Sequence, residues 1–405
     1  MLSLLRIGPL AALFECGFRP FFLLTAASAV LAVAAWAAFF ATGLPLPSTP
    51  GGPVVWHAHA MLYGFAMASV AGFVLTAIPE FTASRAIVRE RVFALLALWI
   101  AGRVAFAAPS IPGAPSVAML ADLGLLAGLT AIVAPRLWSD PDRRHLSFLW
   151  ALLAMTGATA GFHAEALAGA DPMRWLLVMA GLLMALIVVA MSRISMRIVN
   201  AALEEAGETG VEYLARPPRR NLAIFCILLY TVAEFFAPGH PVSGWVALAA
   251  AAALFNLLND WHVGRALLRR WPFMLYLVYW FMALGHALMG VALLTDTPWV
   301  SAGRHLAMIG AMGLAIFAVL NIAGRVHAGF EPDRRPWVPI AVALIAGAAL
   351  IRAAMGFGPF GAGLSMAAAS ACWVTAFGLH LGFHWRVLTR PRTDRQQGCA
   401  GLAED

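Results

Sequence analysis

Long apolar runs separated by short polar connections are the main pattern along this chain of 405 residues. A helix needs roughly 17–25 predominantly apolar residues to cross the hydrocarbon of a bilayer. Twelve runs of about this length therefore predict an all-α, polytopic membrane protein, a helical bundle forming a single transmembrane domain over residues 1–405. The predicted helices cover residues 20–42, 56–79, 92–108, 116–135, 146–168, 173–192, 220–237, 243–261, 272–294, 303–325, 337–355 and 362–387.

The arginines lie mostly in alternate connections, and this alternation predicts how the helices are oriented. Cytoplasmic loops of membrane proteins are enriched in positively charged residues. In the twelve-helix arrangement, all but four of the 27 basic residues, which are all arginines, fall on the side that holds both termini. The exceptions are Arg103, Arg174, Arg304 and Arg352. We therefore predict that both termini are cytoplasmic, with residues 390–405 forming a flexible polar tail.

Composition agrees with a membrane protein and excludes several other classes. Hydrophobic residues make up 62% of the chain and charged residues only 12%, about half the charged share of a soluble domain. The net charge of +7 follows from the arginine-rich loops, so it does not predict a nucleic-acid partner. The four cysteines have no CxxC spacing, so the sequence predicts neither a disulfide framework nor a cysteine metal site.

Histidines on four predicted helices share the outer half of the membrane. They are His57, His59, His163, His286 and His305. Imidazole is the commonest metal ligand and the usual axial ligand of haem, so this shared depth predicts a metal or haem site. Two residues apart on a regular helix, His57 and His59 point about 200° apart. Unless the first turn is irregular, they serve different partners.

A second group of histidines lies toward the cytoplasmic end. His380 and His384 are four residues apart and share a helix face, which is compatible with a shared ion. His327 lies at the same level and is a further metal candidate. The alternative for each of these residues is an ordinary wetted side chain at the membrane interface.

Few other ionisable side chains fall within the predicted helices. Arg103 and Asp122 occupy matching depths on neighbouring helices, and an ion pair would reduce the cost of burying both charges. Glu165 and Glu234 lie near outer helix ends and are candidates for proton transfer. Arg193, at an inner helix end, is a candidate for binding a propionate, a lipid phosphate or the headgroup region.

Several separated stretches carry a family resemblance. They are ECGFRPFFLL at 15–24, WHAHAMLYGF at 56–65, GFHAEAL at 161–167, SRISMRIVN at 192–200, RHLAMIGAMG at 304–313 and GRVHAG at 324–329. In these stretches the chain resembles the NnrS family, multi-pass bacterial proteins linked to nitric oxide and reported to carry haem and copper. It departs from the family pattern at Ala60, where an acid is common, and at Glu80-Phe81, where asparagine-tryptophan is usual.

The resemblance implies haem, of the b type, and copper as cofactors. The residues it places in the cofactor and metal sites are His57, His59, His163 and His305, with Arg19 and Arg193 as further cofactor-binding candidates. His286 is a cofactor-binding candidate because of its depth. It also implies a protein of the bacterial inner membrane that binds or detoxifies nitric oxide, as an oxidoreductase if turnover occurs. Turnover would require quinol or another electron donor.

Two other functions fit the same sequence. Twelve helices with both termini inside are a common layout of secondary transporters. The central parts of the predicted helices carry almost no acidic residues, however, and coupling ions usually need them. A haem-based sensor without turnover is the second alternative. A haem absorption band would separate the haem-binding functions from transport.

Overall fold

Helices make up most of the described residues of this chain. The computed structural model describes residues 11–208, 210–358, 361–392 and 398–399, and no strand occurs among them. In chain order, the main helical elements are α1 (Phe18–Thr42), α2 (Pro53–His59), η3 (Ala60–Ala66), α3 (Met67–Phe81), α4 (Arg89–Ala107), α5 (Ala114–Ser139), α6 (Leu146–Leu167), α7 (Met173–Glu205), α8 (Pro217–Phe236), α9 (Pro241–Leu258), α10 (Arg270–Leu294), α11 (Val300–His305), η6 (Leu306–Met312), α12 (Gly313–Val326), α13 (Trp337–Ala354) and α14 (Ala362–Thr389).

Within the described residues, ten helical segments are long and apolar enough to cross a membrane. The all-helical, multi-pass membrane protein predicted from the apolar runs is therefore confirmed. The other two predicted spans coincide with α4 and α8, which lie outside this set. Charged residues interrupt both, because α4 contains Arg89, Glu90, Arg91 and Arg103, whereas α8 contains Arg219, Arg220 and Glu234.

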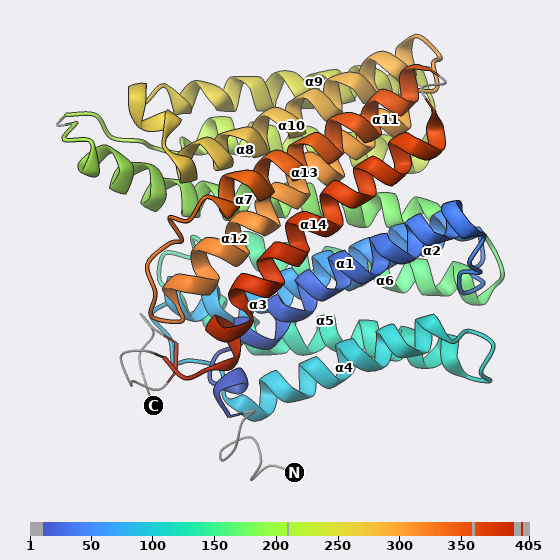
Figure 1. Ribbon diagram of the computed structural model, residues 1–405, viewed down its shortest axis with the longest axis horizontal. Coiled ribbons are helices and arrows are strands. Elements are labelled where there is room, and N and C mark those ends of the chain that lie inside the picture. Colours follow the sequence, from blue (N-terminus) through green and yellow to red (C-terminus); the bar gives the residue numbers. More distant parts are fainter. Residues whose placement is uncertain (1–10, 209, 359–360, 393–397, 400–405) are drawn as a thin grey trace. The chain divides into compact units, whose positions relative to one another are not determined.

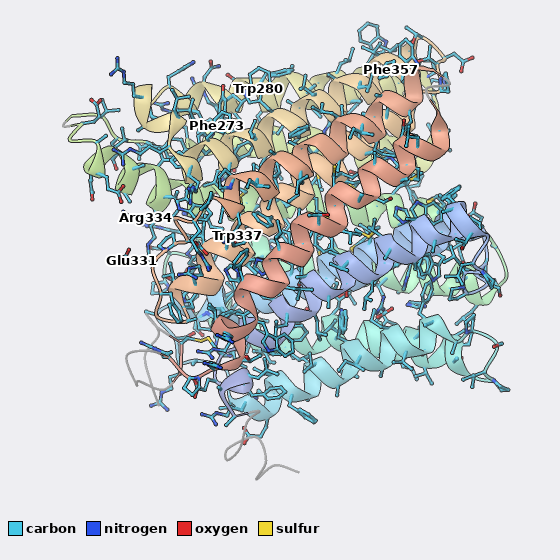
Figure 2. All side chains as sticks on the ribbon, in the orientation of Figure 1. Phe273, Trp280, Glu331, Arg334, Trp337 and Phe357 are labelled. Carbon is cyan, nitrogen blue, oxygen red and sulfur yellow. A yellow bond between two sulfur atoms is a disulfide. The ribbon has the colours of Figure 1, made fainter. Side chains whose placement is uncertain are left out.

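Large apolar side chains cover much of the helices' exposed surface. Leu31 of α1 is 69% exposed, Leu120 of α5 is 65% exposed and Leu364 of α14 is 79% exposed. Phe273 of α10 and Phe357, which follows α13, project from the helices in the same way (Figure 2). Extensive apolar exposure is costly in water and favourable against lipid chains, so these side chains are consistent with a lipid-facing surface.

The contacts along the chain divide it into two compact units. Unit 1 comprises Met1–Met179, Val319–Arg335 and Phe377–Asp405. Inside it, α1 packs on α3 and η3, and α5 packs against α3, α4 and α6 (Figure 1). Gly72 of α3 allows the close approach of α1, because a Cβ atom there would lie 2.8 Å from the ring of Phe22.

Unit 2 comprises Ala180–Ala318 and Pro336–Ala376. Inside it, α10 packs on α9, α11 and η6, while α8 packs on α9 and α13 packs on α11 and η6. Two glycines allow the backbones of α10 and α11 to come into direct contact. A Cβ atom at Gly285 would lie 2.8 Å from the carbonyl oxygen of Gly303, so neither helix has room for a side chain there.

Two π-helical segments interrupt the membrane helices, and each begins directly after a histidine. The η3 segment follows His59, and the η6 segment follows His305. Each is seven residues long, and neither contains proline. π-helical turns are rare and occur frequently at functional sites, so both positions are candidates for function.

The sequence did not predict a disulfide, and here the structure corrects it. Cys16 and Cys399 form one, with their Cα atoms 5.4 Å apart. The two cysteines are separated by 383 residues, so no local spacing in the sequence could reveal that they meet. Cys226 and Cys372 are free thiols.

The described part of the C-terminal segment is held against the start of α1. The guanidinium of Arg19 donates from Nη1 to the carbonyl oxygen of Arg390 at 2.6 Å, and Arg392 is buried. The flexible tail predicted for residues 390–405 otherwise falls on 393–397 and 400–405, which lie outside the described residues.

The disulfide predicts a specific labelling pattern. Protein purified without reductant, unfolded and treated with a polyethylene-glycol maleimide is expected to gain two labels, at Cys226 and Cys372. Reduction before labelling raises the number to four, and C399S labels at three sites without reductant because Cys16 loses its partner. The labels are counted by gel shift. Four labels on the unreduced wild type would contradict the pairing.

Candidate metal centre

Three buried side chains from three helices meet in unit 1. They are His59 at the end of α2, Asp122 of α5 and His163 of α6. Oδ2 of Asp122 lies 3.1 Å from Nε2 of His163 and 3.6 Å from Nε2 of His59. One donor atom from each residue lies within 4.8 Å of the other two. This distance is short enough for one ion to contact all three after small side-chain movements.

A glycine on the neighbouring helix α4 leaves room for the carboxylate of Asp122. The α5 helix packs on both α4 and α6. Gly102 of α4 faces Asp122, and a Cβ atom at that glycine would lie 2.7 Å from the carboxylate oxygen Oδ1. A larger residue at position 102 would therefore displace the carboxylate of Asp122.

Arg103 supplies the charge that balances Asp122. Its Nη2 atom forms an ion pair with Oδ1 of Asp122, as the matching depths of the two residues in the sequence predicted. Its Nη1 atom lies 3.5 Å from Nδ1 of His59. The two oxygens of Asp122 are thus divided: Oδ1 faces the arginine, and Oδ2 faces both histidines.

Aromatic rings surround the imidazole of His59. The ring of Phe106 stacks on it with centroids 3.6 Å apart, and Tyr63 and Phe162 stack at 4.5 and 4.8 Å. The hydroxyl of Tyr63 donates to Oγ1 of Thr159 at 3.0 Å, which fixes the tyrosine ring. This shell keeps water from His59 and strengthens electrostatic interactions inside the cluster.

This arrangement can hold one metal ion through two imidazole nitrogens and one carboxylate oxygen. Such a ligand set suits first-row transition metals, whereas magnesium and calcium prefer oxygen ligands alone. Binding through Nε2 requires the proton of His59 to be on Nδ1. Because Nδ1 faces a donor of Arg103, an ion at Nε2 would require Arg103 to move off the imidazole.

His57 does not join the cluster, although it lies only two residues from His59. Its ring stacks on Trp36 of α1, with centroids 4.4 Å apart and planes inclined by 18°. The two histidines therefore have different neighbours, as their spacing on a regular helix predicted.

His286 and His305 belong to unit 2. Nδ1 of His286 lies 2.8 Å from the carbonyl oxygen of Met282, and Nδ1 of His305 lies 2.7 Å from that of Ser301. Each hydrogen bond runs one turn back along its own helix and places the ring proton on Nδ1. Among the described residues, neither histidine belongs to a group of three metal donors.

Both proton-transfer candidates are paired with arginines. Glu165 forms an ion pair with Arg174 at the end of α6. In unit 2, Oε1 of Glu234 accepts a hydrogen bond from Arg304 at 3.1 Å, while its buried Oε2 has no hydrogen-bond partner among the described residues. Arg193, which also lies in unit 2, is on α7.

The histidines predicted at the cytoplasmic end also lie in unit 1. The rings of His380 and His384 are buried and stack on each other, with centroids 4.1 Å apart. His327 instead lies 3.4 Å from Oε2 of Glu80. In the part of the chain that the structure describes, no third metal donor joins the His380–His384 pair.

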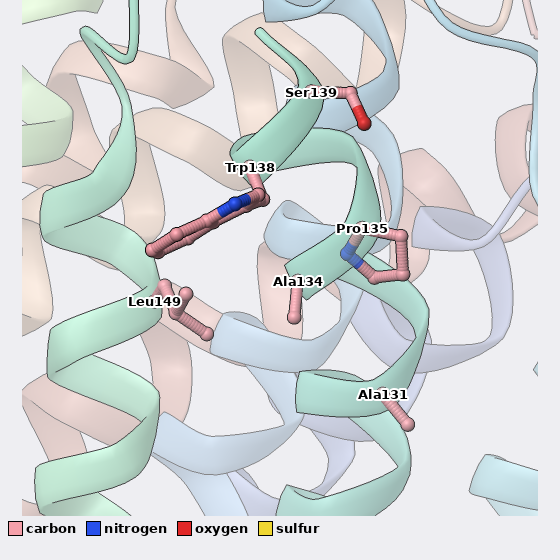
Figure 3. Close-up of a pocket in the computed structure, with 6 residues that line it drawn as sticks. All are labelled: Ala131, Ala134, Pro135, Trp138, Ser139 and Leu149. Carbon is pink, nitrogen blue, oxygen red and sulfur yellow. The ribbon is translucent and has the colours of Figure 1, made fainter.

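A shallow groove at the C-terminal end of α5 contains none of the expected site residues. It is lined by Ala131, Ala134, Pro135, Trp138, Ser139 and Leu149 (Figure 3). None of these side chains is a titratable group or a strong metal ligand. The groove is therefore a poor candidate for chemistry.

The fold and the cluster define a class: an all-helical, multi-pass membrane protein that gathers two histidines and an aspartate inside a helical unit. The family model described as NnrS protein matches residues 12–392. The chain therefore belongs to the NnrS family, as the sequence motifs indicated. No curated protein matches it.

The ion pair inside the cluster predicts a double-mutant result. D122N leaves the largely buried Arg103 beside a neutral amide, and it is expected to destabilise the protein by about 3 kcal/mol. In R103Q/D122N no charge is left unpaired, so the double variant should cost less than the sum of the two single variants. Unfolding of the purified protein in detergent measures all three. Additive costs would mean that the two side chains do not interact.

Proposed function

We propose that the cluster of His59, Asp122 and His163 holds a single transition-metal ion, and that the protein uses it to bind or detoxify nitric oxide in the bacterial inner membrane. One observation carries the metal proposal: three buried donors from three helices lie within 4.8 Å of one another. Family membership supports the link to nitric oxide. Copper is the metal that the family resemblance implies.

The donors fit a small ion better than a porphyrin. Both ring nitrogens of His59 face side chains of the cluster, Arg103 on one side and Asp122 on the other. Nε2 of His163 also faces Asp122. Aromatic rings cover the remaining faces of His59. We therefore assign no haem to these two histidines.

Each side chain would have a distinct role around the ion. When bound, the ion would supply an open coordination position for nitric oxide and a one-electron couple. Oδ2 of Asp122 would supply negative charge to the ion, while Arg103 holds Oδ1 and sets the direction of the carboxylate. Phe106 and Phe162 would exclude water, yet admit a small apolar gas that partitions into lipid.

Haem is a separate part of the proposal. Its candidate ligands are His57, His286 and His305, which lie outside the three-residue cluster. Turnover would further require electrons from quinol or another donor. Protons would have to come from groups such as Glu165 and Glu234, each of which is held by an arginine.

We also propose the twelve-span arrangement with both termini in the cytoplasm. It requires α4 and α8 to cross the membrane despite their charged residues. In α4, the pairing of Arg103 with Asp122 lowers the cost of crossing. In α8, the pairing of Glu234 with Arg304 has the same effect. The remaining charged residues of both helices lie at their N-terminal ends, where arginine side chains can reach the headgroups.

Loss of a ligand should remove the metal. In protein purified in detergent, H59A, D122A and H163A are each expected to lower the bound copper per chain at least about tenfold, while any haem iron stays unchanged. H262A is the matched control, because His262 is exposed and belongs to unit 2. Elemental analysis gives the metal content, and size-exclusion chromatography checks folding. Unchanged metal in three folded variants would refute the assignment.

Haem is tested independently by absorption spectroscopy. Wild-type protein is expected to show a Soret band that shifts when nitric oxide is added, and a pyridine haemochrome gives the haem content. H57A, H286A and H305A are expected to lower the band, whereas H163A is expected to leave it intact. A folded but colourless wild type would exclude the haem proposal and favour a transporter.

A further inference from the structure

Arg19 is fully buried, yet only part of its guanidinium group is satisfied. Its side chain is 0% exposed. Nη1 donates to the carbonyl oxygen of Arg390 at 2.6 Å. Nε and Nη2 are buried, and no residue that the structure describes hydrogen-bonds to either atom. A buried donor without a partner is costly, and more so when it carries charge, so these two atoms need an explanation.

The two unsatisfied atoms form one edge of the guanidinium group. Nε–H and Nη2–H point in nearly parallel directions and form the side-on fork that binds two oxygens of a carboxylate or phosphate. Nη1, which is occupied, lies on the opposite side. Arg19 therefore presents an intact two-pronged donor inside the protein.

Positive charge is concentrated around this fork. Arg392, which is buried, lies within electrostatic range of Arg19 and of Glu15, and Arg89 lies within range of Glu15. The first turn of α1 adds the positive end of a helix dipole, because it has no acidic residue and no side-chain cap. Three arginines thus act electrostatically on a single carboxylate, Glu15, which lies just before the N-terminus of α1.

That carboxylate does not complete the fork. Oε2 of Glu15 forms an ion pair with Nη2 of Arg19 at 3.8 Å, which is too far for a hydrogen bond, and no other described residue hydrogen-bonds to this oxygen. Burial raises the pKa of the Glu15 carboxyl, which makes its charge easier to lose than that of an exposed glutamate. When protonated, Glu15 would donate a hydrogen bond to an anion instead of repelling it.

We propose that the Nε–Nη2 edge of Arg19, with Arg392 and the N-terminus of α1, binds a phosphate group. A phosphate oxyanion offers two oxygens to the fork and enough negative charge for the remaining cations. It could come from the headgroup of an anionic phospholipid or from free phosphate. Arg19 is the second residue of a membrane-spanning helix, a position near the headgroup depth.

This site is separate from the candidate metal centre. Arg19 lies near the start of α1, whereas Trp36, the α1 residue that contacts His57, lies 17 residues further along the helix. At about 1.5 Å of rise per residue, the two positions are roughly 25 Å apart. The phosphate proposal is therefore independent of the metal proposal, and each can be wrong while the other is right.

The test uses full-length protein and two sources of phosphate. In detergent, the midpoint of thermal unfolding is measured with increasing inorganic phosphate, against chloride at equal ionic strength. In nanodiscs, it is measured in phosphatidylcholine with and without phosphatidylglycerol. The variants are R19K, which keeps the charge but loses the fork, and E15Q, which removes the competing carboxylate. R265Q is the control, because it removes an exposed arginine of unit 2.

We expect wild type and R265Q to be stabilised equally by at least one phosphate source, and R19K to lose this response. E15Q should respond at about tenfold lower phosphate, because a like charge has been removed. A response to phosphatidylglycerol alone identifies a lipid headgroup, and a response to inorganic phosphate alone identifies a free anion. If neither source acts, or R19K responds like wild type, the proposal is wrong. The proposal is also wrong if E15Q is less stable than wild type and gains no stabilisation from phosphate, because Glu15 would then be the permanent partner of Arg19. The E15Q measurement decides the question even if R19K does not fold.

Discussion

The buried carboxylate of Asp122 is the constraint on which unit 1 depends. An isolated negative charge in a membrane helix is costly, and this one is shared among a guanidinium and two imidazoles from three other helices. Removing any partner leaves the others with a charge that lipid cannot solvate. The carboxylate therefore joins α2, α4, α5 and α6 more firmly than apolar packing alone can, because helices in lipid gain little from the hydrophobic effect.

The same constraint links stability to chemistry. A carboxylate held by an arginine on one oxygen directs its other oxygen at a fixed point, and here two imidazole nitrogens face that point. A metal centre needs this fixed direction, because ligands that are already oriented lose less freedom when the ion binds. When no metal ion is bound, Arg103 would balance the charge of Asp122. When an ion is bound, Arg103 would hold the carboxylate in the direction that the ion requires.

Sequence patterns could predict the helices, but not how the helices meet. Apolar run length located the helices, and their predicted arrangement paired Arg103 with Asp122. Depth also grouped His163 with His57, whereas the structure joins His163 to His59 and places His57 against Trp36. The choice between two histidines depends on the rotation of α2 about its axis, which packing decides. The π-helical turns after His59 and His305 likewise have no proline to mark them.

The disulfide between Cys16 and Cys399 and the arginines near both termini favour different compartments for the termini. Arginine-rich ends favour the cytoplasm, where thiols are kept reduced, whereas a stable disulfide favours an oxidising compartment. Cys16 and Cys399 are nevertheless close because the C-terminal segment is bound at the start of α1, through the contact of Arg19 with Arg390. That contact needs no covalent bond. A cytoplasmic location and the observed disulfide are compatible if Cys16 and Cys399 are two adjacent thiols in the cell. Arg19 would then hold the C-terminal segment in place, and the two thiols would form the disulfide when they are oxidised.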